Sequence, residues 1–325
     1  MDAKTDLYLE KIEQAISQLP LDIEPTDLYA PVDYSLKNGG KRIRPLMTLL
    51  ACELFGGNLE TALPPAVGLE LFHNFTLMHD DIMDAAPVRR GQPTVHARWN
   101  TNTAILSGDV LFALAYKYIS NVPDQFLRQV MALFNKTVIE VCEGQQYDMD
   151  FETTDTVSSD EYIRMIRLKT AVLPAACLQT GAIVAVASAE DQANIYSFGE
   201  NIGLAFQLRD DWLDVFGEAH KVGKKTGGDI VANKKTWLYI HALDKADNQQ
   251  RQLLMNAFMN RIDNEEEKIR LVKSVYDQLG ISQLAQDVMQ VYYTRAFEFL
   301  QKIRQPEAKK DNLRNLATAL FHRNQ

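Results

Sequence analysis

The sequence is poor in the residues that interrupt a chain or cross-link it. It contains 16 glycines and 11 prolines among 325 residues, a combined share below the roughly 12% of average proteins. With 46% hydrophobic residues, this composition favours long helices over many short strands. The cysteines, Cys52, Cys142 and Cys177, are odd in number and far apart. They predict neither a disulfide framework nor a metal-binding spacing, and they fit a reducing cytoplasm.

Long apolar runs and an excess of positive charge are also missing. The nearest approach to a membrane span, residues 171–189, is interrupted by Pro174 and Gly181 and does not reach ~18 apolar residues. The N-terminus has no basic start followed by an apolar run, so no secretory signal is expected. The net charge is −9, whereas a nucleic-acid-binding protein needs a basic surface. We therefore expect a soluble protein without a nucleic-acid partner.

Helical periodicity extends over most of the chain. Apolar residues recur at intervals of three and four, whereas strand signals are almost absent. Ser158, with Glu161 three residues later, forms a capping box that predicts a helix start. No linker or short repeat divides the chain, so we expect one all-α domain of bundle type over residues 1–325. The predicted helical segments are 7–19, 43–55, 66–84, 103–120, 123–147, 191–215 and several within 251–321.

Two aspartate motifs of the form D-D-x-x-D lie near the ends of predicted apolar helices, at residues 80–84 and 210–214. The first and last aspartates of each motif share a helix face, where like charges destabilise the helix unless a cation lies between them. Carboxylate oxygens combined with substrate phosphates are typical ligands of Mg²⁺. A single motif could be a solvated acidic helix end, but two motifs with apolar flanks favour metal sites.

Basic residues accompany both aspartate motifs. Arginine grips phosphate oxygens with a planar fork, and lysine supplies a point charge. An isolated basic pair is usually surface decoration, but two acidic motifs each followed by cations predict diphosphate groups held by metal and basic residues together. The candidate cations are Lys41, Arg44, Arg89, Arg90, Lys224 and Lys234.

Together these stretches resemble the trans-isoprenyl diphosphate synthases of the polyprenyl synthetase family, in particular the short-chain geranylgeranyl and farnesyl diphosphate synthases. The resemblance implies an all-α isoprenoid synthase bundle around a deep central cavity, with both aspartate motifs at the cavity mouth. It also implies a homodimer. The matching motifs are GGKRIRP (39–45), FHNFTLMHDDIMD (72–84), RRGQPTVH (89–96), KT (169–170), FQLRDDWLDVFG (206–217), GKKTGGDI (223–230) and NKKTW (233–237).

The activity implied by the resemblance is a Mg²⁺-dependent, head-to-tail condensation. Isopentenyl diphosphate would react with dimethylallyl, geranyl or farnesyl diphosphate, and diphosphate would be released. Three Mg²⁺ ions are expected when substrate is bound. Their principal ligands would be Asp80, Asp84 and Asp210, with Asp81, Asp211 and Asp214 in support.

The resemblance also assigns the substrate contacts residue by residue. Without the motif, His73 would more simply be a core histidine, but it lies seven residues before Asp80 and therefore on nearly the same helix face. The contacts to the allylic diphosphate would be Arg89, Lys169, Lys224 and Lys234. The contacts to isopentenyl diphosphate would be Lys41, Arg44, His73 and Arg90, and the polar contacts to the allylic cation would be Thr170 and Gln207.

Two other functions share part of this pattern. A class I terpene cyclase resembles the chain in its first aspartate motif and helical fold, but typically carries a different second motif and lacks GGKRIRP. A non-catalytic subunit of a heteromeric prenyl synthase usually loses aspartates or basic contacts. Because this chain keeps all of them, both alternatives are less favoured than an active synthase.

Pro174 lies four residues after Thr170 in an otherwise helical run. Because proline has no N–H group, the Thr170 carbonyl loses its usual helical partner. We hypothesise that this carbonyl and the Thr170 hydroxyl direct partial negative charge at the allylic cation. The simpler alternative is a proline kink without a chemical role.

The residues before Asp80 predict the product length, because one helical turn of about 5.4 Å corresponds to about one isoprene unit. Thr76, four residues before Asp80, is small and leaves its level open, whereas Phe75 and Phe72 would close the next levels. One aromatic at the fifth upstream position, without an insertion in the motif, resembles geranylgeranyl synthases. The pattern therefore favours a product of 20 carbons over one of 15, unless both phenylalanines are plain core residues.

Overall fold

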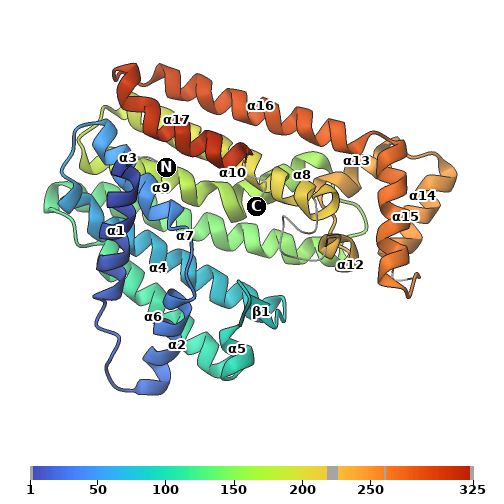
Figure 1. Ribbon diagram of the computed structural model, residues 1–325, viewed down its shortest axis with the longest axis horizontal. Coiled ribbons are helices and arrows are strands. Elements are labelled where there is room, and N and C mark those ends of the chain that lie inside the picture. Colours follow the sequence, from blue (N-terminus) through green and yellow to red (C-terminus); the bar gives the residue numbers. More distant parts are fainter. Residues whose placement is uncertain (1–2, 218–225, 260, 323–325) are drawn as a thin grey trace. The chain divides into compact units, whose positions relative to one another are not determined.

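The computed structural model describes residues 3–217, 226–259 and 261–322 (Figure 1). In these ranges the secondary structure is helical apart from one two-stranded hairpin. The chain forms two compact units. The first unit comprises Met1–Asn135, Ala176–Ile195 and Gln305–Leu313, and the second comprises Lys136–Ala175, Tyr196–Arg304 and Arg314–Gln325.

Most helices and strands lie entirely within one of the two units. The first unit holds α1 (Ala3–Ser17), α2 (Thr26–Lys37), α3 (Ile43–Leu54), α4 (Leu59–Met83), β1 (Val88–Arg89), β2 (Gln92–Pro93), α5 (Val95–Arg98) and α6 (Thr101–Ile119). The second holds α8 (Ser159–Ile166), the π-helical turn η1 (Arg167–Ala171), α12 (Gly228–Val231), α13 (Trp237–Lys245), α14 (Asn248–Phe258), α15 (Glu265–Gln278) and α16 (Ile281–Lys302). The unit boundaries fall inside α7 (Asp124–Thr153), α9 (Val172–Val184), α10 (Ala189–Phe216) and α17 (Glu307–His322).

Helix α4 is the central helix of the first unit and packs mainly against α6 and α3. From Ala62 onward most of its residues are buried, as expected for a helix that is apolar on all sides. Gly68 permits the close contact with α6. A Cβ atom at this position would lie 2.7 Å from the Ile119 side chain and 2.9 Å from the Ala115 carbonyl oxygen. The last turn of α4 carries the first aspartate motif.

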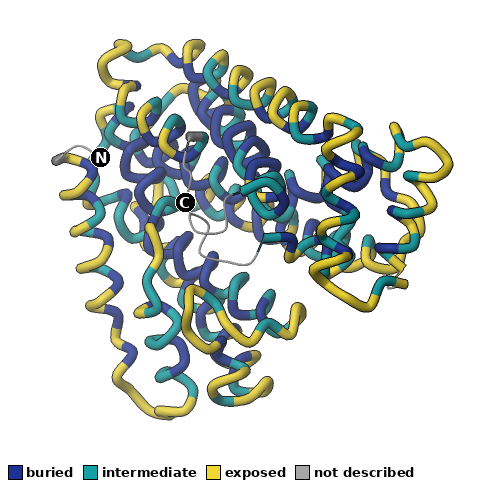
Figure 2. The backbone as a smooth tube through the Cα atoms, turned by 45° about the vertical axis from the view of Figure 1, so that its right-hand side comes forward, coloured by how far each residue is buried: buried dark blue, intermediate teal, exposed yellow. Residues whose placement is uncertain are grey.

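In the second unit, α13 packs against α8, α15 and α16. Buried residues alternate with exposed ones along α8, α15 and α16, which is the pattern of one-sided packing (Figure 2). The predicted capping box is confirmed, because Ser158 Oγ accepts from the Glu161 N–H and the Glu161 carboxylate accepts from the Ser158 N–H. Among the described residues, no helix is both long and apolar enough to span a membrane.

The predicted helices are present, but α4 begins earlier than predicted, and α5, α12 and α13 were not predicted. Helix α4 begins at Leu59 rather than near residue 66, where Asn58 caps its first turn by accepting from the Glu60 N–H. The helix continues through Pro64 and Pro65. Helix α2 was not predicted. The hairpin β1–β2 was not predicted either, and it turns through Arg90 and Gly91, both at positive φ, the conformation that two-residue hairpin turns require. One domain over residues 1–325 stays a prediction.

We expect Gly68→Val to lower the thermal unfolding midpoint by several degrees. Overpacking of a tight helix contact typically costs about 1–3 kcal/mol, and in a chain of this size each kcal/mol corresponds to about 2–4 °C. Circular dichroism of Glu60→Val, an exposed position on the same helix, is the matched control. Equal midpoints for the two variants would contradict the close α4–α6 packing.

Candidate active site

The first aspartate motif occupies the C-terminal end of α4, where the helix dipole disfavours negative charge. Asp84 caps the helix and donates its N–H to the Asp80 carbonyl at 2.9 Å. Arg89 of β1 compensates the carboxylates. Its Nε lies 2.6 Å from Asp81 Oδ1, and its Nη2 lies 3.3 Å from Asp80 Oδ2. Burial raises the pKa of Asp81, and Arg89 opposes this shift. Arg89 thus touches the motif itself.

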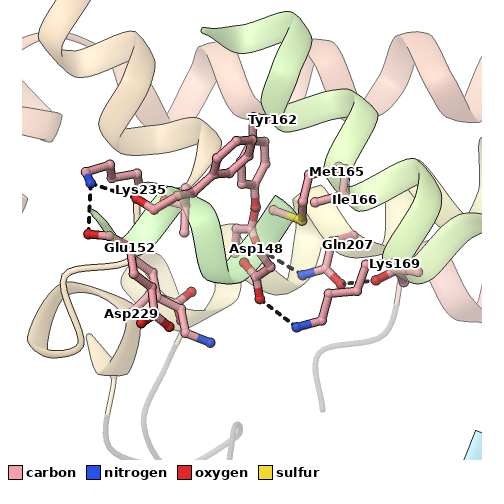
Figure 3. A pocket seen from close by; sticks show the side chains of 14 residues that line it. Asp148, Glu152, Tyr162, Met165, Ile166, Lys169, Gln207, Asp229 and Lys235 are labelled. Atoms are coloured by element: carbon pink, nitrogen blue, oxygen red, sulfur yellow. Dashed lines mark hydrogen bonds and ion pairs between the residues drawn. The ribbon is translucent and has the colours of Figure 1, made fainter. Parts of the chain in front are cut away.

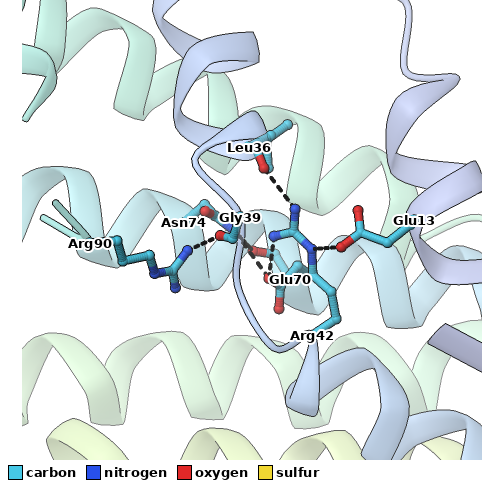
Figure 4. A network of polar contacts seen from close by, with 7 residues as sticks. All are labelled: Glu13, Leu36, Gly39, Arg42, Glu70, Asn74 and Arg90. Atoms are coloured by element: carbon cyan, nitrogen blue, oxygen red, sulfur yellow. Dashed lines mark hydrogen bonds and ion pairs between the residues drawn. The ribbon is translucent and has the colours of Figure 1, made fainter. Parts of the chain in front are cut away.

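Arg42 anchors the basic loop that precedes α3 (Figure 4). It is buried in the left-handed conformation, at φ 46. Its guanidinium donates to Glu13 at 2.8 Å, to Glu70 at 2.9 Å and to the Leu36 carbonyl at 2.7 Å. The loop is therefore attached to α1, α2 and α4 through one side chain.

Two further arginines lie beside this loop, Arg44 at the start of α3 and Arg90 of the hairpin turn. Arg44 Nε is buried without a hydrogen-bond partner, and burial lowers the pKa of this guanidinium. Arg90 donates to the Gly39 carbonyl (Figure 4). A Cβ atom on Gly40 would lie 2.9 Å from the Arg90 guanidinium, so only glycine fits there without displacing it. Lys41, the third predicted basic residue, is exposed.

His73 lies buried among four arginines. Burial and then the charges of Arg44, Arg90, Arg89 and Arg42 lower its pKa well below the ordinary value. A neutral histidine in this surrounding can donate or accept one hydrogen bond without adding positive charge. The structure thus joins His73 and the predicted cations Arg44, Arg89 and Arg90 into one electropositive site that suits an anionic ligand.

The predicted chain-length residues lie in an aromatic cluster of the first unit. Phe75 stacks on Phe112 of α6 with ring centroids 4.9 Å apart, and Phe72 packs against both rings and against Phe134. Phe72 is fully buried. Thr76 donates its hydroxyl to the His73 carbonyl at 2.8 Å. The cluster therefore combines α4 with α6 and α7, which the sequence did not indicate.

The second aspartate motif lies near the C-terminal end of α10, again where the dipole disfavours carboxylates. Asp214 accepts from the Asp229 N–H at 3.0 Å and so fixes the start of α12. Asp211 is buried and accepts from the Tyr162 hydroxyl at 2.5 Å and from Gln207 Nε2 at 3.0 Å. Burial, and next the charge of Asp229, raise the Asp211 pKa to about 8. A metal role for Asp211 stays a prediction.

A pocket of about 110 Å³ in the second unit gathers several predicted residues (Figure 3). Lys169 pairs with Asp148 at 2.6 Å. Thr170 donates to Gln207 Oε1 at 3.2 Å. Because the Gln207 amide donates to Asp211, its carbonyl oxygen is the end that faces Thr170. The lining residues are Asp148, Phe151, Glu152, Tyr162, Met165, Ile166, Lys169, Thr170, Gln207, Asp211, Asp229, Lys234, Lys235 and Thr236.

Two lysines enter this pocket from the segment before α13. Lys234 lines the pocket, and Lys235 donates to the carbonyls of Phe151 at 2.7 Å and Thr154 at 2.5 Å. Lys235 therefore closes the C-terminal end of α7, where unpaired carbonyls attract a cation. Lys224 lies outside the described residues.

The helix around Thr170 is irregular. Residues Arg167–Ala171 form the π-helical turn η1, and α9 starts at Val172, so Pro174 lies in the first turn of α9. Because proline has no N–H group, it donates no helical hydrogen bond to the Thr170 carbonyl. A chemical role for the Thr170 carbonyl stays a prediction.

Several functional candidates escaped sequence reasoning because their partners are distant in sequence. Arg42 and Glu70 pair across 28 positions, and Tyr162 reaches Asp211 across 49. Glu70 could have been noticed as a lone carboxylate in the apolar stretch 66–72. In the described part of the chain no three His, Cys, Asp or Glu side chains form a metal cluster. The oxygen-only donors at the motifs are nevertheless the ligand type that Mg²⁺ prefers.

Comparison with known proteins agrees with this arrangement. A family model described as polyprenyl synthetase matches residues 25–279. A geranylgeranyl diphosphate synthase of Methanosarcina mazei is 42% identical over 236 residues, covering 72% of this chain and 73% of that protein. A short chain isoprenyl diphosphate synthase of Methanothermobacter thermautotrophicus is 35% identical over 304 residues, 93% of each. A crystal structure of a geranylgeranyl pyrophosphate synthase superposes with a TM-score of 0.92 at 40% identity, covering 100% of both chains.

We expect the metal-free protein to lose stability as pH rises from about 4 to about 8. In this range the folded state keeps the Asp211 proton, because its pKa is raised to about 8, whereas the unfolded state has released it. The free energy of unfolding therefore falls with rising pH, and Asp211→Asn should flatten this slope. Denaturant unfolding in excess chelator, with Asp277→Asn as the exposed control, measures the effect. Parallel slopes for wild type and Asp211→Asn would refute it.

Proposed function

Because this chain belongs to the polyprenyl synthetase family, we propose that it is a short-chain all-trans polyprenyl diphosphate synthase. It condenses isopentenyl diphosphate with allylic diphosphates head to tail and releases diphosphate. The observation that carries the proposal is that each unit holds an aspartate motif at a helix end beside basic side chains. The product we propose is geranylgeranyl diphosphate, with farnesyl diphosphate as the alternative.

In this reaction the carbon–oxygen bond of the allylic diphosphate breaks, and the diphosphate leaves with the electron pair. Arg89, Lys169, Lys224 and Lys234 hold the leaving group and stabilise its negative charge. The Thr170 hydroxyl oxygen and the Gln207 carbonyl oxygen, which are 3.2 Å apart, lie close enough together to face one cationic carbon.

Isopentenyl diphosphate supplies the electrons of its double bond to the allylic cation. Lys41, Arg44, His73 and Arg90 bind its diphosphate group. The buried, electropositive surrounding of His73 supports this assignment. A proton then leaves the carbon next to the new cation and is accepted by the departing diphosphate, so the charges balance.

The aspartate motifs fit Mg²⁺ by their donor chemistry, since both supply hard carboxylate oxygens next to a diphosphate site. Asp80, Asp84 and Asp210 would be the principal ligands of three ions, with Asp81, Asp211 and Asp214 in support. When bound, the ions neutralise the developing charge of the leaving group.

We further propose a homodimer in a reducing, cytoplasmic location. Ile105 and Leu106 on α6 are 40% and 57% exposed, an apolar surface that a second copy of the chain can cover. Cys52, Cys142 and Cys177 are unpaired thiols, which a reducing compartment maintains. A terpene cyclase or a non-catalytic subunit is less favoured because all six aspartates and the basic residues are retained.

We expect Asp80→Ala and Asp210→Ala each to reduce turnover by at least about 100-fold, since each removes a carboxylate that would hold a Mg²⁺ ion beside the leaving group. Excess chelator should abolish the activity of the wild type. The assay combines the purified protein with allylic and isopentenyl diphosphates, and Asp277→Ala, an exposed aspartate near a helix C-terminus, is the control. Full activity in chelator would disprove the metal requirement.

We expect Phe72→Ala and Phe75→Ala each to lengthen the product and the double variant to lengthen it most. Removing a ring from the aromatic cluster opens a level for about one further isoprene unit. Chromatography of the products measures their length. Phe297→Ala, in an aromatic contact of the second unit, controls for loss of packing. Unchanged products from all Phe72 and Phe75 variants would place the floor on another helix.

A further inference from the structure

The π-helical turn η1 carries both Lys169 and Thr170. Its hydrogen bonding is shown by the Val172 N–H, which donates to the Arg167 carbonyl five residues earlier. Such turns are rare, insert one residue relative to an α-helix and are frequent at functional sites. Because an α-helix is the more stable alternative, the surroundings must hold η1 in place.

Two glycines let the neighbouring helices touch the backbone of η1. A Cβ atom on Gly144 of α7 would lie 2.2 Å from the Lys169 nitrogen. On the other helix, a Cβ atom on Gly203 of α10 would lie 2.6 Å from the Ala171 Cα atom. These contacts fix the position of the turn. The rotation of the turn about the helix axis then depends on contacts of its side chains.

Each glycine lies between two polar residues that bind η1. On α7, Glu140 and Asp148 each lie four residues from Gly144, and Asp148 pairs with Lys169. On α10, Glu200 and Gln207 flank Gly203, and Gln207 binds Thr170. Glu140 and Glu200, the two residues that precede these glycines, both pair with Arg167 at the start of η1. The distances are 3.1 Å to Glu200 and 3.8 Å to Glu140.

Arg167 separates two partly buried carboxylates. The Glu140 and Glu200 side chains are 14% and 23% exposed. Burial raises the Glu140 pKa, while Lys136 and Arg167 oppose the shift. Glu140 Oε2 is buried without a hydrogen-bond partner. Lys136 also lies 3.9 Å from Glu140, but Arg167 is the cation that contacts both carboxylates, and without it their like charges would repel each other across the turn.

We propose that Arg167, through Glu200 and Glu140, is a positioning residue that holds η1 in its π-helical register and so aims Lys169 and Thr170 into the pocket. Relaxation to an α-helical register would rotate the following side chains by about 100°, away from Asp148 and Gln207. The inference rests on the roles proposed above for Lys169 and Thr170.

The test compares Arg167→Gln with Arg164→Gln, an exposed arginine on the preceding helix. Arg167→Gln should lower kcat/KM for the allylic diphosphate by about 10- to 100-fold, the loss expected when catalytic groups shift by about 1 Å. The KM for isopentenyl diphosphate should stay within about twofold, because its proposed contacts lie in the other unit. Hydrogen exchange of the amides at 168–172 should become faster in Arg167→Gln, and Arg164→Gln should match wild type in all three measurements.

A double variant, Arg167→Gln with Glu200→Gln, separates positioning from charge relief. It should recover thermal stability by removing the repulsion, but it should not recover the allylic kinetics. Recovery of both would overturn the proposal, and so would unchanged kinetics or unchanged exchange in Arg167→Gln. If Arg167→Gln does not fold, Glu200→Gln alone must show the allylic defect. An inactive wild type would refute the proposed function instead. The hydrogen exchange of the amides at 168–172 would then still show whether Arg167 holds η1 in place.

Discussion

The central constraint on this protein is the repulsion between carboxylates at the C-terminal ends of two apolar helices. Each motif adds like charges where the helix dipole is already negative, so neither helix end is stable without nearby compensation. At α4 this compensation includes Arg89, which contacts Asp80 and Asp81. At α10 it includes burial of Asp211, whose pKa rises to about 8. Both ends remain rich in oxygen donors.

The surrounding architecture supplies charge of the opposite sign in a fixed geometry. Arg42 is bound on three sides, and this attachment holds the loop that carries Arg44 and contacts Arg90. A buried charge needs such partners, since its desolvation is otherwise costly. The pairing of Arg42 with Glu70 therefore belongs to the anion site, although neither residue was predicted to touch substrate.

Three backbone irregularities lie at or beside side chains that we propose to be functional. Arg90 lies in a hairpin turn at φ 53, Arg42 precedes α3 at φ 46, and η1 interrupts the helix that carries Lys169 and Thr170. Each of these conformations is less stable than its regular alternative. Each is stabilised by contacts from elements far away in the sequence. Orienting these groups therefore lowers the stability of the fold locally, and the distant contacts offset this loss.

The sequence by itself determined the helical class, the position of most helices and the residues of both aspartate motifs, because periodicity and charge repulsion are local properties. It did not indicate the π-helical turn η1, which precedes Pro174. Tertiary structure decided the rest. Whether Asp211 is buried, whether Lys235 donates to the last carbonyls of α7, and which helices pack around Phe72 depend on partners separated by tens of residues. Such contacts follow from how helices pack, and local sequence patterns do not encode them.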